Sequence, residues 1–260
     1  MNATRLGKKH LWILSIVLCT YFPLSFATDY IYPSNWYVGG DLGIAMLSLS
    51  NSSASVPNGN TDPALANTDL YSISKPGSTP LVSLQGGYRW TRVSPWFSNF
   101  TLGLRYQYLL SSKVSGSIEQ YSDPTKTNYD YSLNFSTHVL SVLGKLTVYQ
   151  HKHFAPYVTL GVGEAFNNVG GYSETAQGDV AARTSPGYQS KTAMNTAFSA
   201  GLGVDYIFNR KLSMSLGYEY ANLGTLKTGN GSGTWSNSSL ALGTLTSNTI
   251  LLGVHYQLPE

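Results

Sequence analysis

Apolar and polar residues alternate along most of the chain, and the alternation is clearest between residues 198 and 220. From Phe198 to Tyr206 the even positions are apolar and the odd positions are small or acidic. The pattern resumes from Leu212 to Tyr220 after the triplet Asn-Arg-Lys. A repeat of two residues predicts β-strands with one apolar face. Eight such segments follow one another, at residues 36–49, 81–92, 96–111, 132–149, 155–167, 192–208, 211–223 and 246–258.

The connections between these segments alternate in length. Residues 50–80, 112–131, 168–191 and 224–245 are long and polar, whereas "RVSP", "YQHKHFA" and "NRK" are short. Long and short connections in alternation are typical of an up-and-down barrel whose two termini lie at the short-turn end. We therefore expect an all-β fold, an eight-stranded antiparallel up-and-down barrel.

The direction of the apolar face separates two kinds of eight-stranded barrel. In a soluble barrel of the lipocalin type, the apolar face would point inward around a ligand. Here the apolar face is crowded with aromatic rings, and the polar face holds Gly, Ser and Thr with isolated charges. Several segments also reach the roughly 9–11 residues that a strand needs to cross a bilayer. The pattern favours a transmembrane β-barrel with its apolar face toward lipid.

Charged residues of the strands fall on the polar face. If they faced lipid, each of the three bases would cost about 2–4 kcal/mol near the midplane, against a net stability of roughly 5–15 kcal/mol. We therefore expect a charge network in the lumen, formed by Asp41, Arg89, Arg105, Lys145, Asp205 and Glu219. Within it we expect Asp41 to pair with Arg89, and Arg105 to pair with Glu219.

The lumen of an eight-stranded barrel is just filled by side chains, so the charge network can serve as packing alone. Inward positions with small residues either leave a gap in the lumen or relieve crowding around the charged side chains. These positions include Gly43, Gly103, Gly161, Gly163, Gly201 and Gly203.

The hairpin around residues 209–211 tests the register of the strands. A two-residue turn would set apolar positions against polar ones, whereas a three-residue turn pairs Phe208 with Leu212 and keeps the faces aligned. The three-residue turn also places Glu219 opposite Gly201, which leaves room for the glutamate side chain.

Aromatic residues gather at the ends of the predicted strands. Rings at this position suit the boundary between headgroups and hydrocarbon. We expect one aromatic girdle beside the short turns, formed by Trp36, Trp90, Trp96, Tyr206 and Phe208, and a second at the other boundary, formed by Tyr106, Tyr108, Tyr218 and Tyr220.

The first 27 residues have the features of a cleaved secretory signal. Basic residues precede the apolar run "LWILSIVL", and a small-x-small site ends at Ala27. We expect residues 28–260 to form a single barrel domain without cysteine, because Cys19 leaves with the signal. The signal also holds three of the 16 basic residues and none of the 13 acids. The remaining chain is balanced in charge, which gives no reason to expect nucleic-acid binding.

The stretches "WYVGGDLGIAM", "APYVTLGVGEAF", "LSMSLGYEYANLG" and "TILLGVHYQL" resemble the eight-stranded bacterial outer-membrane barrels. This broad group contains the OmpA transmembrane domain, OmpW-type proteins and opacity-type surface antigens. The resemblance implies a monomer in the Gram-negative outer membrane, surrounded by membrane lipid and lipopolysaccharide, with its long loops outside the cell. It departs from the group at the last strand, where Pro259 and Glu260 follow the final aromatic residue, Tyr256.

Two functions are compatible with this resemblance. The long loops would serve surface display, adhesion to an extracellular ligand or host surface, or envelope structure. Alternatively, the lumen would form a narrow passive channel for small or apolar molecules, as in OmpW-type proteins. Trp235, in the polar stretch 228–239, is a candidate recognition residue, and it can equally fold back on the barrel rim.

Catalytic and metal-binding patterns are weak. His138 and Ser141 are three residues apart on one strand and so point to opposite faces, which does not make a nucleophile and base. His151 and His153 supply only two imidazoles for a metal, and His255 is expected in the lumen. We therefore expect no enzymatic activity, no metal and no cofactor. Glu164 falls on the lipid-facing side, so it either lies above the hydrocarbon or follows a β-bulge after Gly163.

Overall fold

A computed structural model describes residues 34–94 and 97–259. The predicted signal, with Cys19, and the girdle residue Trp96 lie outside the described residues. Within the described ranges, no helix is long and apolar enough to cross a membrane.

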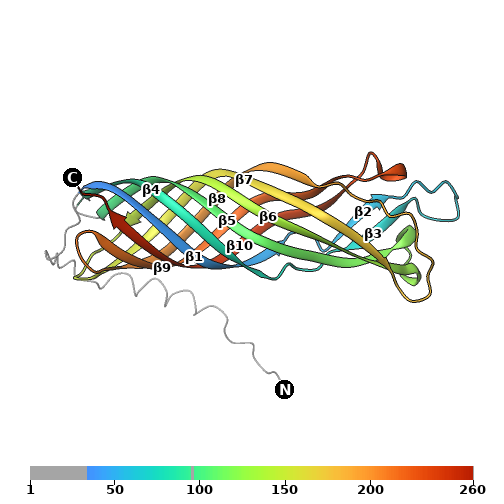
Figure 1. Ribbon diagram of the computed structural model, residues 1–260, viewed down its shortest axis with the longest axis horizontal. Helices are drawn as coiled ribbons and strands as arrows, with labels where there is room; N and C mark the ends of the chain where they lie inside the picture. Colours follow the sequence, from blue (N-terminus) through green and yellow to red (C-terminus); the bar gives the residue numbers. More distant parts are fainter. Residues whose placement is uncertain (1–33, 95–96, 260) are drawn as a thin grey trace, which may run out of the picture.

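Eight antiparallel strands form a closed ring in chain order, and β1 pairs with β10 to complete it (Figure 1). Three short 3-10 helices lie in the connections, η1 (Gln120–Ser122), η2 (Pro124–Lys126) and η3 (Gly233–Trp235). A separate hairpin, β2 (Ser53–Pro57) and β3 (Thr68–Ser72), pairs with the far end of β5. The predicted eight-stranded up-and-down barrel is thus confirmed, and its strands are β1 (Asn35–Leu49), β4 (Ser78–Ser94), β5 (Phe97–Glu119), β6 (Thr127–Thr147), β7 (Phe154–Ala176), β8 (Lys191–Ile207), β9 (Leu212–Asn230) and β10 (Ser239–Gln257).

The hairpin between β8 and β9 has the predicted register. Phe208 N donates to Leu212 O at 3.0 Å, and Glu219 pairs with Gly201. The side chain of Asn209 accepts hydrogen bonds from the backbone N–H groups of Lys211 and Leu212, at 2.8 and 2.9 Å. The Asn209 side chain thus satisfies two backbone N–H groups of the turn, which stabilises its three-residue length.

Most ring strands are longer than the alternation predicts. Strand β5 runs to Glu119 rather than residue 111, and β6 begins at Thr127 rather than residue 132. The predicted loops 112–131, 168–191 and 224–245 are therefore wrong over much of their length, and the loop 50–80 contains the β2–β3 hairpin. Together these segments continue the barrel at its long-loop end, at the right of Figure 1. We call this part the extension.

The polarity of the two faces reverses along a single strand, β6. Its inward residues are Tyr129, Tyr131, Leu133 and Phe135 in the extension, and then become mostly polar toward Lys145. Outward residues change in the opposite sense at the same height. They are Asp130, Ser132 and Asn134 in the extension and Leu140 and Val142 beyond it. Leu140 and Val142 belong to a belt of exposed apolar side chains around the ring, which we call the apolar belt. This is the surface that a membrane barrel presents to hydrocarbon.

β-Bulges separate the extension from the part of the barrel with the apolar belt on several strands. The register between β9 and β10 shifts near Gly224 and Gly243, which have φ of +75° and +93°. These angles lie in the left-handed region, where glycine is favoured because it has no Cβ. On β5 the register shifts between Leu109 and Ser112. Each bulge moves the inward positions by one residue, which interrupts the period of two.

Glu164 is not displaced by a bulge. Its neighbours pair without interruption, Gly163 with Ala197 and Ala165 with Asn195. The alternative of a bulge after Gly163 is therefore wrong, and the half-buried Glu164 stays on the outward face, opposite Leu140.

Candidate functional site

Two buried ion pairs lie inside the ring at the level of the apolar belt. Arg105 Nη1 is 2.6 Å from Glu219 Oε2, the pair that the sequence predicts. Gln107 Nε2 donates to the other glutamate oxygen at 3.1 Å. Lys145 Nζ is 2.7 Å from a carboxylate oxygen of Asp205. Both pairs are almost inaccessible to water, so the loss of one partner would leave an uncompensated buried charge.

The predicted pair of Asp41 with Arg89 is wrong. Strand pairing sets Asp41 opposite Ser83 and sets Arg89 opposite Asn35, six positions or about 20 Å further along the strand. Asp41 instead accepts hydrogen bonds from Ser83 Oγ at 2.5 Å and Gln85 Nε2 at 2.9 Å. His255 Nε2, which was expected in the lumen, lies 3.5 Å from Asp41.

Arg89 occupies the short-turn end of the interior. Its Nη1 donates to Gln257 Oε1 at 3.1 Å, and its guanidinium lies 5.7 Å from the centre of the Tyr37 ring. All six residues of the predicted network are thus buried inside the ring, but they do not form one network, and Arg89 is not paired with Asp41.

The inward glycines relieve crowding. A Cβ on Gly103 would lie 2.8 Å from the Tyr37 hydroxyl, and one on Gly203 would lie 2.5 Å from the Tyr157 hydroxyl. A Cβ on Gly161 would lie 2.5 Å from Ser199 Oγ. The same holds for Gly43, Gly163 and Gly201, where a Cβ would meet another atom within 3 Å. Tyrosine hydroxyls, a serine hydroxyl or backbone atoms of neighbouring strands thus lie next to these glycines, which leave no gap, and a charged side chain, Arg105, lies near Gly161 only, at 3.6 Å.

An apolar layer lies above the ion pairs toward the long-loop end. Its side chains have exposed fractions of 3% or less, so water has little access to them. The layer includes Leu109, Val139, Ala165, Leu223 and Leu245. Side chains thus fill the interior at this level.

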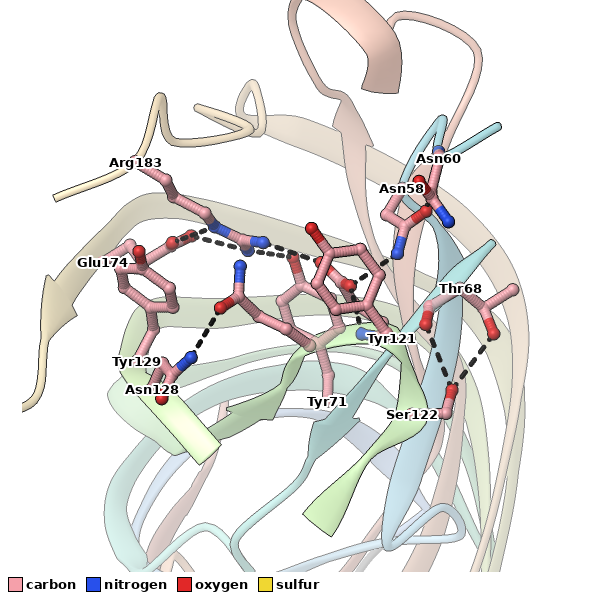
Figure 2. Close-up of polar contacts among 12 residues, drawn as sticks. Asn58, Asn60, Thr68, Tyr71, Tyr121, Ser122, Asn128, Tyr129, Glu174 and Arg183 are labelled. Carbon is pink, nitrogen blue, oxygen red and sulfur yellow. Dashed lines mark hydrogen bonds and ion pairs between the residues drawn. The ribbon is translucent and has the colours of Figure 1, made fainter. Parts of the chain in front are cut away.

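A second charged cluster, which the sequence analysis missed, lies in the extension. Arg183, in the connection between β7 and β8, reaches back over the mouth of the ring (Figure 2). Its Nη1 is 2.7 Å from Asp69 Oδ2 and its Nε is 2.7 Å from Glu174 Oε1. The guanidinium also lies 4.8 Å from the centre of the Tyr129 ring. Arg183 therefore ties the β7–β8 connection to β3 and β7.

Burial alone would lower the pKa of Arg183, but its hydrogen bonds to Glu174 and Asp69 outweigh that effect and raise the pKa above its ordinary value. Arg183 therefore stays charged throughout the accessible pH range. Two carboxylates surround one guanidinium, an arrangement held by charge-assisted hydrogen bonds.

Four tyrosines pack beneath Arg183. Tyr71 contacts Tyr131 and Tyr188 edge to face, with ring centres 5.4 and 6.3 Å apart, and Tyr172 contacts Tyr188 at 4.9 Å. Burial raises the pKa of all four hydroxyl groups. Edge-to-face contacts add to the stabilisation from buried area, so these rings make the extension a packed β-structure. No sequence motif marks the cluster, because its members come from four distant segments.

Trp235 lies in this core. Its ring is buried, and its centre lies 5.5 Å from the Arg183 guanidinium. Of the two alternatives for Trp235, the structure shows the one in which it folds back, so the ring is not displayed for recognition.

The histidines of the barrel contact different neighbours. His138 points outward, where its Nδ1 lies 2.6 Å from the Tyr106 hydroxyl, whereas Ser141 points inward. His153 Nδ1 lies 2.6 Å from Ile207 O, and His151 stacks on Tyr149. Among the described residues, no three His, Cys, Asp or Glu side chains gather as metal ligands.

Aromatic rings occupy both edges of the apolar belt. At the short-turn edge Trp36, Trp90, Tyr206 and Phe208 all lie on the exposed outer face. Tyr206 packs against Phe208 with ring centres 5.0 Å apart. At the other edge lie Tyr106, Tyr108, Tyr218 and Tyr220, where Tyr108 stacks on His138.

Comparison with known proteins identifies the family. The protein-family model for the outer membrane protein beta-barrel domain matches residues 14–257 of the chain. The chain therefore belongs to this family, and it is an outer-membrane β-barrel protein. A search of curated proteins finds no significant match to the chain.

Several solved structures are similar. Neisserial surface protein A is 14% identical, with a TM-score of 0.48, over 86% of this chain and 97% of that one. OprG from Pseudomonas aeruginosa is 14% identical, with a TM-score of 0.46, over 89% of this chain and 100% of that one. Ail, the attachment invasion locus protein of Yersinia pestis, is 11% identical, with a TM-score of 0.40, over 86% and 99%.

Proposed function

We propose that this protein displays a rigid β-structure on the outside of the Gram-negative cell, where the tips of its hairpins bind an extracellular ligand or host surface or serve the envelope. The orientation, with the extension outside and the short turns in the periplasm, is part of the proposal. A barrel that only had to cross the membrane would not need strands that continue beyond the belt.

The observation that carries this proposal is the packed core of the extension. Its outward face is polar and its inward face is apolar, so it is built for water on the outside. Arg183 and the tyrosines beneath it fix the β7–β8 connection, which leaves the tips at residues 58–67 and 120–126 as exposed polar surface on a rigid base. Rigid presentation lowers the entropy cost of binding a partner.

Single cysteines test the orientation, because the described chain contains none. Thr61→Cys and Thr125→Cys lie at the tips, and Arg210→Cys lies in a short turn. A membrane-impermeant maleimide applied to intact cells is expected to label the first two variants, and the third only after lysis. Labelling of Arg210→Cys on intact cells would reverse the orientation.

Replacement of residues 58–67 by a short Gly-Ser turn tests adhesion. Cells that carry this variant are expected to attach less to a host-cell layer, while a variant with the short turn 209–211 changed attaches normally. Equal attachment by both variants and by cells without the protein would remove adhesion from the proposal and leave an envelope role.

A narrow passive channel is the second candidate. The lumen of the barrel carries polar and charged side chains, which would suit a channel. The apolar layer that fills the interior above the ion pairs does not favour the passage of small molecules. Planar bilayers separate the two functions. Purified protein is expected to give no stepwise conductance, whereas reproducible conductance altered by Arg105→Ala would favour the channel.

A further inference from the structure

The tip of the β2–β3 hairpin begins with an asparagine that is followed by a glycine, Asn58-Gly59. Asn58 comes directly after Pro57, the last residue of β2. Gly59 is exposed, and its φ of +72° lies in the left-handed region, which a glycine adopts readily. A second Asn-Gly pair, Asn230-Gly231, lies at the end of β9. The two pairs have the same covalent structure, so their surroundings decide how they differ.

Hydrogen bonds hold both atoms of the Asn58 carboxamide. Its Nδ2 donates to Asp69 Oδ1 at 2.8 Å and to Ala66 O at 3.4 Å. Its Oδ1 accepts from Asn60 N at 2.9 Å (Figure 2). The oxygen of this side chain therefore meets a backbone N–H group, and the nitrogen meets a carboxylate.

The backbone nitrogen of Gly59 is available for reaction. Within the described ranges, Gly59 N donates to no acceptor, whereas Gly231 N donates to Trp235 O at 3.1 Å and to Ser238 O at 3.0 Å. Gly59 also has no Cβ that would hinder the approach of this nitrogen to the preceding side chain. A bond between Gly59 N and Asn58 Cγ closes a five-membered ring, and reacting atoms held so close together behave as a highly concentrated pair.

We propose that Asn58 is a site of spontaneous deamidation and that the product weakens the attachment of the β2–β3 hairpin to the extension. Gly59 N attacks Cγ of Asn58, so that a new C–N bond forms and the bond from Cγ to Nδ2 breaks. Nδ2 leaves as ammonia with the proton that Gly59 N loses, and a succinimide remains. Water then adds to either carbonyl of the succinimide and opens it to aspartate or isoaspartate. The net change is asparagine and water to aspartate and ammonia, without oxidation or reduction.

The Asn60 N–H group promotes the first step. Negative charge develops on Oδ1 of Asn58 as the nitrogen attacks, and Asn60 N already donates to this oxygen in the unreacted chain. A donor aimed at the atom where charge develops stabilises the transition state. The Asn230 carboxamide accepts no hydrogen bond from any residue that the structure describes. Asn58 is therefore the Asn-Gly pair that reacts first.

The product replaces an attractive contact by a repulsive one. Asn58 loses the N–H group that donates to Asp69, and aspartate sets a second carboxylate against this residue, whose side chain is only 1% exposed. Like charges so placed repel each other. Asp69 also accepts from Tyr121 N at 3.0 Å and pairs with Arg183, so it joins β3 to the tip 120–126 and to the β7–β8 connection. The inference goes beyond the proposed function, because this covalent change needs no partner.

Ageing of the purified protein in detergent at mildly alkaline pH tests the first part of the proposal. Peptic digestion at acid pH, which limits further conversion, is followed by mass spectrometry of the peptides. Asn58 is expected to convert about tenfold faster than Asn230, because Gly231 N must first leave its carbonyl acceptors and no donor assists the Asn230 carboxamide. Asn58→Gln should stay unchanged at this position, since its longer side chain closes a larger ring more slowly. No conversion of Asn58, or equal rates at Asn58 and Asn230, would overturn the proposal.

Hydrogen exchange of the β3 amides tests the second part. In Asn58→Asp these amides are expected to exchange about tenfold faster than in the fresh parent protein, the effect of losing one hydrogen bond to a charged group. Aged parent protein should approach the exchange of Asn58→Asp, whereas aged Asn58→Gln should exchange as it does when fresh. Slow exchange in Asn58→Asp, or equal acceleration of Asn58→Gln with age, would overturn the loosening of the hairpin. Attachment to host surfaces plays no part in these measurements, so this proposal and the proposed function fail separately.

Discussion

Replacement of Arg183 by glutamine should loosen the extension without unfolding the membrane barrel. The change removes the guanidinium and leaves a shorter, neutral polar side chain. Asp69 and Glu174, whose side chains are only 1% and 3% exposed, would then face each other without a counter-charge. Like charges in a site of low dielectric repel strongly, and water has little access to either carboxylate.

The size of the effect follows from burial. Removing one partner of a buried ion pair costs about 3–5 kcal/mol, and the lower value is appropriate because the Arg183 side chain is 14% exposed. A loss of about 3 kcal/mol makes opening of the extension about 100-fold more frequent. Hydrogen exchange of the amides in β3 and in residues 177–190 measures this opening directly.

The matched control is Lys126→Gln. Lys126 lies 4.0 Å from Asp123 with both side chains 37% exposed, and exposed pairs of this kind contribute little. Its exchange should equal that of the parent chain. If Arg183→Gln exchanges no faster than Lys126→Gln, then Arg183 does not hold the extension closed. Partial recovery of protection is expected when Asp69→Asn is added, since one uncompensated charge is then removed.

Three further predictions concern other parts of the barrel. Arg105→Met alone should lower the free energy of unfolding, measured by denaturant titration, by about 3–5 kcal/mol. A double-mutant cycle with Glu219→Gln should show that the two changes are coupled. Additive changes in the free energy of unfolding would contradict a direct pair. Gly224→Ala should lower the temperature at which folded mobility is lost, because φ is +75° and the new Cβ meets Asn195; the control Gly77→Ala, which meets nothing within 4 Å, should not. Absorbance at 295 nm should show tyrosines that stay neutral well above pH 10, because burial raises the pKa of Tyr71 and Tyr131. The stability that these two neutral hydroxyl groups contribute is fully present below their unfolded pKa near 10 and is lost as the pH rises through the folded pKa. Uniform ionisation of all tyrosines near pH 10 would refute the burial of these two.

The membrane part of the barrel could be predicted from the sequence because hydrocarbon outside and the lumen inside require apolar and polar side chains, respectively, on the two faces of each strand. Outward residues such as Leu202 meet hydrocarbon and inward residues such as Asp205 do not, so the period of two is continuous through the belt. The turn at Asn209 and the pair of Arg105 with Glu219 follow from the same register.

The extension could not be predicted by that rule, since its apolar face points the other way. On β9 the inward positions change from Leu223 to Leu226 across the bulge at Gly224, and the polar residues beyond it are typical of a loop by composition. The partner of Asp41 was mistaken for a similar reason, because alternation gives the face of a residue but not its height. His255, a residue of the last strand, becomes its neighbour only when β10 closes the ring on β1.

The reversal of polarity along β6 fixes how deeply the protein sits in its membrane. A shift of the barrel by two residues along a strand, about 7 Å, would bring Ser136 and Asn134 into hydrocarbon or leave Leu140 in water. Burial of polar groups or exposure of apolar ones opposes both shifts on this strand, whereas a small mismatch in bilayer thickness costs only a fraction of a kcal/mol per Å. The lipid therefore adjusts to the protein, and the hairpin tips stay at a constant height above the membrane.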